Sequence, residues 1–142
     1  MNVSDIMTGK VITVGQDEPV MAAVRLLKRH NVGALPVTDQ SGRLRGLVTD
    51  RDIVLRCVAA GEDVRTMPVN EIMSRGILTA QPGDSVAQAA ESMAREQIRR
   101  LPVTENGRVV GMVSLCDLAR QESCRRECTK AVESISSNFR MR

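Results

Sequence analysis

Hydrophobic residues recur at the period of an α-helix in two stretches of the chain. Each stretch places apolar residues at i, i+3, i+4 and i+7, which lines one side of a helix. The first set is Val20, Ala23, Val24 and Leu27, and the second is Val86, Ala89, Ala90 and Met93. Residues suited to helix N-caps precede both sets, Asp17 or Glu18 in the first and Asp84 with Ser85 in the second. The pattern predicts two amphipathic helices, each with one buried face.

Short aliphatic and β-branched runs between polar turns predict the strands. The first strands are expected at 11–14 and 77–80, and the last at 44–48 and 109–113. Leu-Pro-Val at 35–37 and 101–103 opens a second strand in each half, because proline is tolerated only at strand starts or on edge strands. Hairpin turns follow at 40–42 and 106–107, and further helices are expected at 50–60 and from residue 115 to 121.

The two halves are copies of one pattern. Val3 recurs as Val69, 66 positions later, and so do the Ile-Met and Leu-Pro-Val motifs. After a one-residue deletion in a turn the offset is 65, so that Gly46 recurs as Gly111. Repeat units generally bury their apolar faces against each other. We therefore look for function where the copies meet.

The order of elements is β-α-β-β-α, twice, which predicts an α+β fold with an α/β-like alternation. The 142 residues suffice for one compact domain, whereas each copy alone would be marginal. We expect the copies to pack as an intramolecular pseudo-twofold pair. The expected divisions are residues 1–61, a linker at 62–68, residues 69–122, and a helical or frayed tail at 123–142.

Composition narrows the classes of partner. The net charge of +3 comes from 20 basic and 17 acidic residues, which indicates a mixed solvated surface and no nucleic-acid partner. The chain has one Phe and no Trp or Tyr. The core is therefore expected to consist of aliphatic side chains, and the base of any ligand would pack against aliphatic rather than aromatic side chains. The first residues do not resemble a signal peptide, and no apolar run is long enough to span a membrane. We expect a cytoplasmic protein with four reduced cysteines.

Motifs at corresponding positions of both copies carry a resemblance to a known family. Residues 46–52, Gly-Leu-Val-Thr-Asp-Arg-Asp, and residues 111–117, Gly-Met-Val-Ser-Leu-Cys-Asp, resemble the signature that closes a CBS domain. Residues 5–8, Asp-Ile-Met-Thr, and residues 71–74, Glu-Ile-Met-Ser, resemble the segment that opens one. The resemblance covers residues 3–122 and identifies a tandem CBS pair, or Bateman module. It implies a regulatory protein that binds AMP, ADP, ATP or S-adenosylmethionine in a cleft between the copies, with no obligatory cofactor.

The closing motif has the chemistry that such a ligand needs. Thr49 and Ser114 lie where a strand passes into a helix, so their hydroxyls meet the positive end of the helix, where a phosphate is stabilised. Asp52 and Asp117, three residues on, can accept both hydroxyls of a ribose, because carboxylate oxygens are acceptors only. The alternative is that Thr49 or Asp50 merely caps the helix and Asp52 complements its dipole.

The second copy departs from the first at this motif. Arg51, which can reach a phosphate, is replaced by Cys116, so we expect the second site to bind more weakly or stay empty. Arg99 and Arg100 can compensate with guanidinium donors, or they are solvated residues on a connection. By resemblance to the family, Thr13 and Thr79 border the base, and Val14 and Ala80 beside them can form its apolar wall. The alternative is that all four are ordinary strand residues with no ligand contact.

No catalytic motif is present, so we expect a binding protein rather than an enzyme. His30 stands at the end of a predicted helix, where a surface or capping position is the usual one. The resemblance also implies a homodimer, for which Val54 and Val58 are candidate contact residues. Two alternatives remain open: a ligand-free protein-interaction module, and a thiol or metal sensor that uses Cys124 and Cys128, four apart in the tail.

Overall fold

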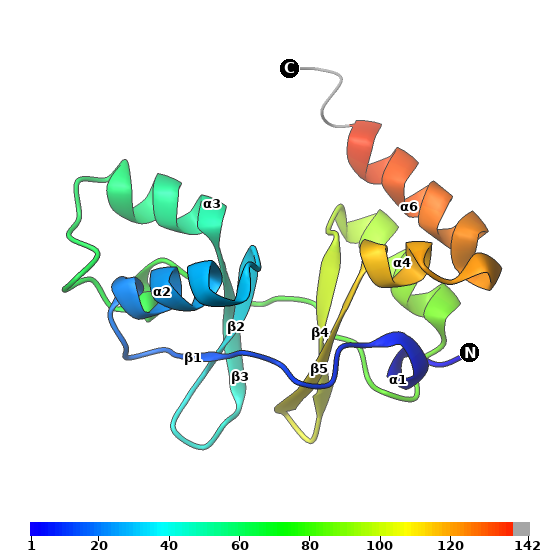
Figure 1. The fold of residues 1–142 in the computed structure, drawn as a ribbon, viewed down its shortest axis with the longest axis horizontal. Coiled ribbons are helices and arrows are strands. Elements are labelled where there is room, and N and C mark those ends of the chain that lie inside the picture. The colour runs from blue at the N-terminus through cyan, green and yellow to red at the C-terminus, as the bar shows by residue number, and fades with distance from the viewer. Residues whose placement is uncertain (138–142) are drawn as a thin grey trace. The chain divides into compact units, whose positions relative to one another are not determined.

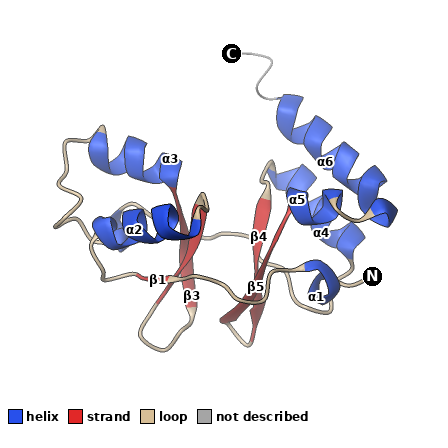
Figure 2. Cartoon of the chain, viewed as in Figure 1, coloured by secondary structure: helices blue, strands red, loops and turns tan. Residues whose placement is uncertain are grey.

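Two similar arrangements of helices and short strands form the protein in a computed structural model that describes residues 1–137 (Figures 1 and 2). The first copy contains α1 (Val3–Ile6), β1 (Val14–Gly15), α2 (Val20–His30), β2 (Ala34–Thr38), β3 (Leu44–Thr49), α3 (Asp50–Asp52) and the π-helical η1 (Ile53–Val58). The second contains the 3₁₀ turn η2 (Val69–Glu71), α4 (Val86–Glu96), β4 (Arg100–Glu105), β5 (Arg108–Ser114) and α5 (Leu115–Ala119). A 3₁₀ turn, η3 (Glu122–Cys124), and α6 (Arg125–Ser136) follow. The α+β class is confirmed.

The compact units of the structure do not coincide with the copies in the sequence. The copy-one unit consists of residues 12–77 with 107–109, and the copy-two unit of residues 1–11, 78–106 and the described chain from 110. Val69, Ile72 and Met73, from the second copy, are buried in the core of the copy-one unit. Val3, from the first copy, is fully buried in the other core. The copies therefore exchange their opening segments.

Each exchanged segment extends a sheet. Ser74 and Leu47 exchange two backbone hydrogen bonds of 2.9 and 3.0 Å, and Thr8 and Met112 do the same at 2.8 and 3.0 Å. Glycine permits this approach, because a Cβ on Gly46 would lie 2.6 Å from the Ser74 carbonyl oxygen. A Cβ on Gly111 would lie 2.5 Å from the Met7 sulfur. The glycine that begins each closing motif is thus a packing requirement of the exchange.

Proline shortens the first strand of each copy. In the copy-one unit the strand order is β1-β2-β3, with β1 parallel and β3 antiparallel to β2. Pro36 is the third residue of the middle strand, not an early or edge residue as expected. It pairs with Leu47, whose N–H and C=O both bond Ser74, so no donor is needed on the β3 side. On the β1 side the missing N–H ends the ladder, and β1 has two residues instead of the expected four.

The second copy follows the same rule. Ala80 donates its N–H to the Pro102 carbonyl at 2.9 Å and accepts from Thr104 at 2.9 Å. The next bond back along the chain would need an N–H on Pro102. The expected strand at 77–80 is therefore a single bridge between Ala80 and Val103.

Amphipathic helices cover the sheets as the periodicity predicts. In α2, Val20, Ala23 and Leu27 are buried, and α4 buries its four predicted residues. The expected helix at 50–60 is helical through Val58, and its second part is a π-helix. The expected helix from Leu115 ends at Ala119, two residues early.

The tail forms a helix that packs on the copy-two unit. Helix α6 lies against α4 and α5 and buries Ala131 and Ile135. Gln97 donates its side-chain amide to the Ser134 hydroxyl at 2.7 Å, and Ser134 donates to the Ala94 carbonyl at 2.9 Å. The end of the expected tail, residues 138–142, lies outside the described residues.

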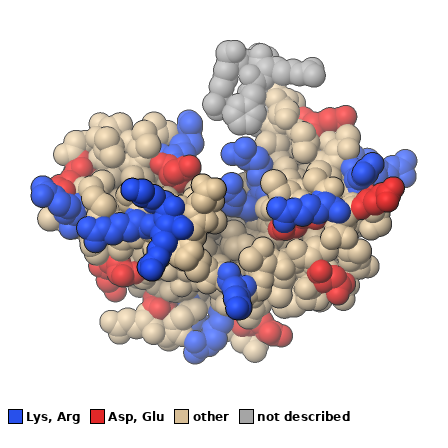
Figure 3. All heavy atoms as spheres, in the orientation of Figure 1, with Lys and Arg blue, Asp and Glu red and all other residues tan. Residues whose placement is uncertain are grey.

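The surface carries both signs of charge. On the face shown in Figure 3, basic and acidic side chains alternate with uncharged surface, in line with 20 basic and 17 acidic residues in the chain. Over residues 1–137 no helix combines the length and the apolar character that a membrane span requires.

We expect Gly46→Ala and Gly111→Ala each to lower the free energy of unfolding by about 1–3 kcal/mol, because the new methyl group must displace an exchanged segment. Urea denaturation followed by circular dichroism measures this loss. Gly9→Ala is the matched control, since a Cβ there meets nothing within 4 Å. Equal stability of all three variants would contradict the close packing of the exchanged segments.

Candidate ligand-binding site

The closing motif of the first copy forms a reciprocal cap at the start of α3. Asp52 donates its backbone N–H to the Thr49 hydroxyl oxygen at 3.0 Å, and Thr49 donates its backbone N–H to Asp52 Oδ2 at 3.0 Å. This pairing satisfies two backbone donors that a helix start leaves open. The capping interpretation of Thr49 is therefore correct in the structure. It leaves the Thr49 hydroxyl proton without an acceptor among the described residues.

The second copy repeats the cap with one difference. Ser114 donates its backbone N–H to Asp117 Oδ2 at 2.7 Å, and the Asp117 N–H reaches the Ser114 hydroxyl oxygen at 3.4 Å. The Ser114 hydroxyl also donates to Asp117 Oδ2 at 3.1 Å. In copy two the hydroxyl proton of Ser114 is therefore engaged within the motif, whereas in copy one the hydroxyl proton of Thr49 stays available.

Each cap aspartate keeps a second oxygen that the cap does not use. Asp52 Oδ1 lies 3.8 Å from Arg56 Nε, and Asp117 Oδ1 lies 3.6 Å from Arg120 Nη1. The aspartate side chains are only 12% and 11% exposed, so both carboxylates are held in place at a partly buried position. At such distances the ion pairs are loose, and exposed arginines contribute little to stability.

Arg56 and Arg120 were not among the residues predicted from the sequence. Their signal was the spacing, since residues three and four apart on a helix are neighbours. Arg56 also donates to the carbonyls of Ile72 at 3.2 Å and Met73 at 3.4 Å. It therefore links the cap of copy one to the exchanged segment in the same unit.

Backbone hydrogen bonds place further predicted residues beside the caps. The Asp50 N–H donates to the Gly33 carbonyl at 3.1 Å, and the Leu115 N–H donates to the Arg99 carbonyl at 3.0 Å. Arg99 therefore lies next to the second cap, at the position where copy one has glycine. Its side chain is exposed, and Arg100 is half-buried. Arg51 is exposed on the first turn of α3.

The residues of the first strand lie on the other side of the middle strand. In the copy-one unit β2 separates β1 from β3, so Thr13, which precedes β1, and Thr49, the last residue of β3, do not lie on neighbouring strands. Thr13 and Thr79 are exposed, whereas Val14 and Ala80 are 1% and 3% exposed and belong to the cores. The threonines are the members of these pairs whose side chains stand at the surface.

The cysteines of the copy-two unit are close enough to influence one another. Burial raises the pKa of the Cys128 thiol, and the neighbouring Cys116 and Cys124 raise it further. Cys128 donates to the Leu115 carbonyl at 3.7 Å. Because the thiolate is the reactive and metal-binding form, a raised pKa makes Cys128 less reactive at neutral pH. Within residues 1–137 no three His, Cys, Asp or Glu side chains are arranged to hold a metal ion.

Comparison with known proteins gives matches over nearly the whole chain. Residues 3–58 and 69–123 each match the CBS domain family. The chain is 43% identical to the CBS domain-containing protein YhcV of Bacillus subtilis, over 95% of each protein. It is 38% identical to hypoxic response protein 1 of Mycobacterium tuberculosis, over 82% of this chain and 81% of that protein.

Two solved structures are similar in fold. Hypoxic Response Protein I with two coordinated zinc ions gives a TM-score of 0.79 at 36% identity, covering 85% of this chain and 98% of that one. The CBS domain pair of protein MJ0100 in complex with 5′-methylthioadenosine and S-adenosyl-L-methionine gives 0.76 at 32% identity, covering 84% and 94%.

We expect Thr49→Val to lower the free energy of unfolding by about 1 kcal/mol without any ligand, because the Asp52 N–H loses its acceptor. Chemical denaturation measures the change. Thr49→Ser, which keeps the hydroxyl, is the control and should remain close to the unaltered protein. If Thr49→Val is as stable as Thr49→Ser, the hydroxyl does not act as a cap.

Proposed function

Because this chain belongs to the CBS domain family, a class of regulatory rather than catalytic modules, we propose that it binds an adenosine-containing ligand: AMP, ADP, ATP or S-adenosylmethionine. The supporting observation is the reciprocal cap, present in both units, which fixes an aspartate through Oδ2 and leaves Oδ1 with a loose partner. The relative that binds 5′-methylthioadenosine and S-adenosyl-L-methionine supports the ligand class.

In the proposed complex the ribose is held by the aspartate. A ribose hydroxyl donates to Oδ1 of Asp52 or Asp117, while Oδ2 keeps the cap. The carboxylate is fixed before the ligand arrives, so binding costs little side-chain entropy. Capping and ligand binding are therefore compatible uses of one residue, because a carboxylate accepts several hydrogen bonds.

The phosphate and the base take the remaining predicted residues. In copy one the phosphate would accept the Thr49 hydroxyl proton and pair with Arg51, an exposed residue of the first turn of α3, where an anion is stabilised. In copy two the Ser114 proton is already engaged, and Arg99 and Arg100 stand in for Arg51. Thr13 and Thr79 border the base, and Val14 and Ala80 next to them form the apolar wall of the base site. We propose that the copy-one site is the stronger.

The protein is also proposed to be a homodimer. Val54, Leu55 and Val58 are 55%, 49% and 58% exposed on one helical segment. Their counterparts in copy two, 65 positions later, are Ala119, Arg120 and Ser123, which are small or polar. Only copy one therefore presents an apolar strip here, and a second copy of the same strip would cover it.

We expect isothermal titration calorimetry to detect binding of AMP, ATP or S-adenosylmethionine, and Asp52→Asn to weaken it by about tenfold or more, because a charged acceptor is lost. Asp50→Asn is the matched control, since Asp50 lies in the same turn and, among residues 1–137, its carboxylate accepts only the Arg51 N–H. Absence of heat with these three ligands and with ADP would exclude the proposed function, and equal affinity of Asp52→Asn would exclude the role of Asp52.

Replacing the strip by the copy-two residues, Val54→Ala with Leu55→Arg and Val58→Ser, should convert the dimer to a monomer. Sedimentation equilibrium measures the mass. Val132→Ser is the control, because Val132 is 44% exposed on α6, away from the strip in the sequence and in another unit. A triple variant that stays dimeric, or an unaltered protein that is monomeric, would contradict the proposed interface.

A further inference from the structure

Three of the four cysteines lie in the copy-two unit, where α5 and α6 pack together. Cys116 is the second residue of α5 and is exposed, and Cys128 is the fourth residue of α6 and is half-buried. Cys124 is buried directly before α6. Cys116 stands where the first copy has Arg51, and the other two lie beyond the second copy. The first copy therefore has no such group of thiols.

The Cys128 thiol lies against the start of α5. Its sulfur donates to the Leu115 carbonyl oxygen at 3.7 Å. That carbonyl belongs to the peptide bond between Leu115 and Cys116, and in a trans peptide its oxygen is about 2.8 Å from the next Cα atom. The Cys128 sulfur is therefore within about 6.5 Å of the Cys116 Cα atom. Rotation of the exposed Cys116 side chain and a small approach of α6 can then bring the two Cα atoms and sulfurs into the range of a disulfide.

Cys124 is the less suitable partner for Cys128. Residues four apart on a helix hold their Cβ atoms about 5–6 Å apart, whereas a disulfide needs about 3.5–4.5 Å. Within residues 1–137 no three His, Cys, Asp or Glu side chains converge on a point that could hold a metal ion. Cys116 raises the pKa of Cys128, an electrostatic effect that requires the two sulfurs to be near each other. The structure thus pairs Cys128 with Cys116, whereas the spacing in the sequence pairs it with Cys124.

We propose that Cys116 and Cys128 form a redox-active pair that is oxidised by low-molecular-weight disulfides, and that the resulting bond ties α6 to α5. The exposed Cys116 is the attacking thiol, because reagents in solution reach it. The half-buried Cys128 is the resolving thiol.

The oxidation consists of two thiol–disulfide exchanges. The Cys116 thiolate attacks one sulfur of the small disulfide, breaks its S–S bond and releases one thiolate. The Cys128 thiolate then attacks the Cys116 sulfur of the mixed disulfide and releases the second thiolate. The protons lost by the two cysteines pass through water to the two released thiolates. Two protein thiols are oxidised, and one small disulfide is reduced to two thiols. Because the mixed disulfide is held beside Cys128, proximity speeds the second exchange.

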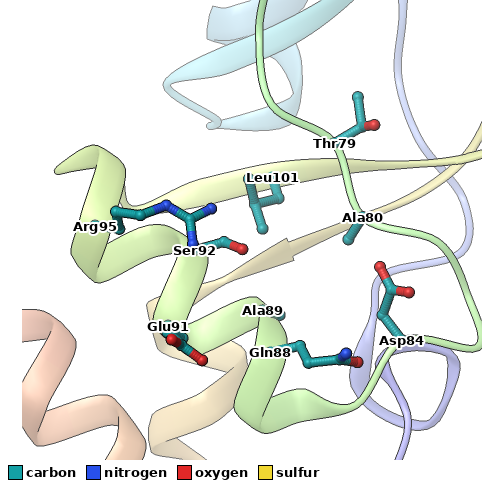
Figure 4. Close-up of a pocket in the computed structure, with 9 residues that line it drawn as sticks. All are labelled: Thr79, Ala80, Asp84, Gln88, Ala89, Glu91, Ser92, Arg95 and Leu101. Atoms are coloured by element: carbon teal, nitrogen blue, oxygen red, sulfur yellow. The ribbon is translucent and has the colours of Figure 1, made fainter.

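The cavity of the copy-two unit lies on another face of α4. It measures about 330 Å³, and Figure 4 shows it between α4 and the segment that leads into it. Thr79 and Ala80, the residues proposed for the base, line it, so it is assigned to the proposed adenosine site. Helix α6 contacts α4 at Ala94 and Gln97, which do not line the cavity. The thiols of α6 are therefore distinct from the cavity, and their oxidation can be tested with no ligand present.

The test is incubation of the reduced full chain with oxidised glutathione, followed by mass spectrometry of the intact protein and of its tryptic peptides. Trypsin cleaves after Arg120, Arg125 and Lys130, so each of the three cysteines falls in a peptide of its own. The unaltered protein should lose two hydrogens and yield the Cys116 peptide linked to the Cys128 peptide.

Variants separate the two exchanges. Cys128→Ser should stop at the mixed disulfide, with one glutathione on Cys116. Cys116→Ser should react at least about tenfold more slowly, because the thiol that reagents in solution reach is gone. Cys124→Ala is the matched control and should form the disulfide as the unaltered protein does. In the oxidised protein, amide hydrogen exchange within α6 should slow, and dithiothreitol should reverse the change, because the bond holds α6 on α5.

The proposal is overturned if the unaltered protein does not react, if glutathione stays on Cys116, if the linked peptide is that of Cys124, or if the bond joins two chains. Unchanged exchange in α6 after oxidation also overturns it. Cys116→Ser alters an exposed side chain, so it tests the pair even if another variant disturbs packing. Adenosine binding enters none of these measurements.

Discussion

The close approach of two backbones at Gly46 and Gly111 is the constraint on which the rest of the structure depends. Without a side chain there, Ser74 can lie beside Leu47 and Thr8 beside Met112, and each sheet gains the opening segment of the other copy. That pairing fixes β3 and β5 from one side, while β2 and β4 fix them from the other. The strand ends therefore have defined positions. Those ends carry the caps, so the candidate site depends on a contact made three residues upstream.

The cap also removes an apparent conflict between structural and functional uses of the same residues. A carboxylate has two oxygens, and in both copies the cap occupies Oδ2 while Oδ1 remains beside a loosely held arginine. A side chain fixed by its own helix start is better prepared for a ligand than a freely rotating one. The two copies differ at the hydroxyl group. The Ser114 hydroxyl donates a hydrogen bond to Asp117, whereas the Thr49 hydroxyl does not donate to Asp52.

The sequence predicts those features of the structure that are set by interactions between residues close together in the chain. Helices α2 and α4 follow from the spacing of apolar residues, and the caps follow from Thr or Ser three residues before Asp. The exchange could not be predicted, because the Ile-Met segments of the two copies are nearly identical and fit either sheet. The short β1 depends on which side the Pro36 nitrogen faces, which the sequence does not show.

The exchanged segments have a consequence for how such a protein can arise. A polypeptide with one copy of this pattern would leave the edge beside its closing strand bare, because its own opening segment belongs to another sheet. It would complete its fold only by trading that segment with a second molecule. Joining two copies in one chain converts this trade between molecules into one within a molecule, so assembly no longer depends on concentration. The two copies are then free to diverge in sequence. In a pair of identical chains every substitution occurs in both partners, whereas in one chain a substitution changes a single copy.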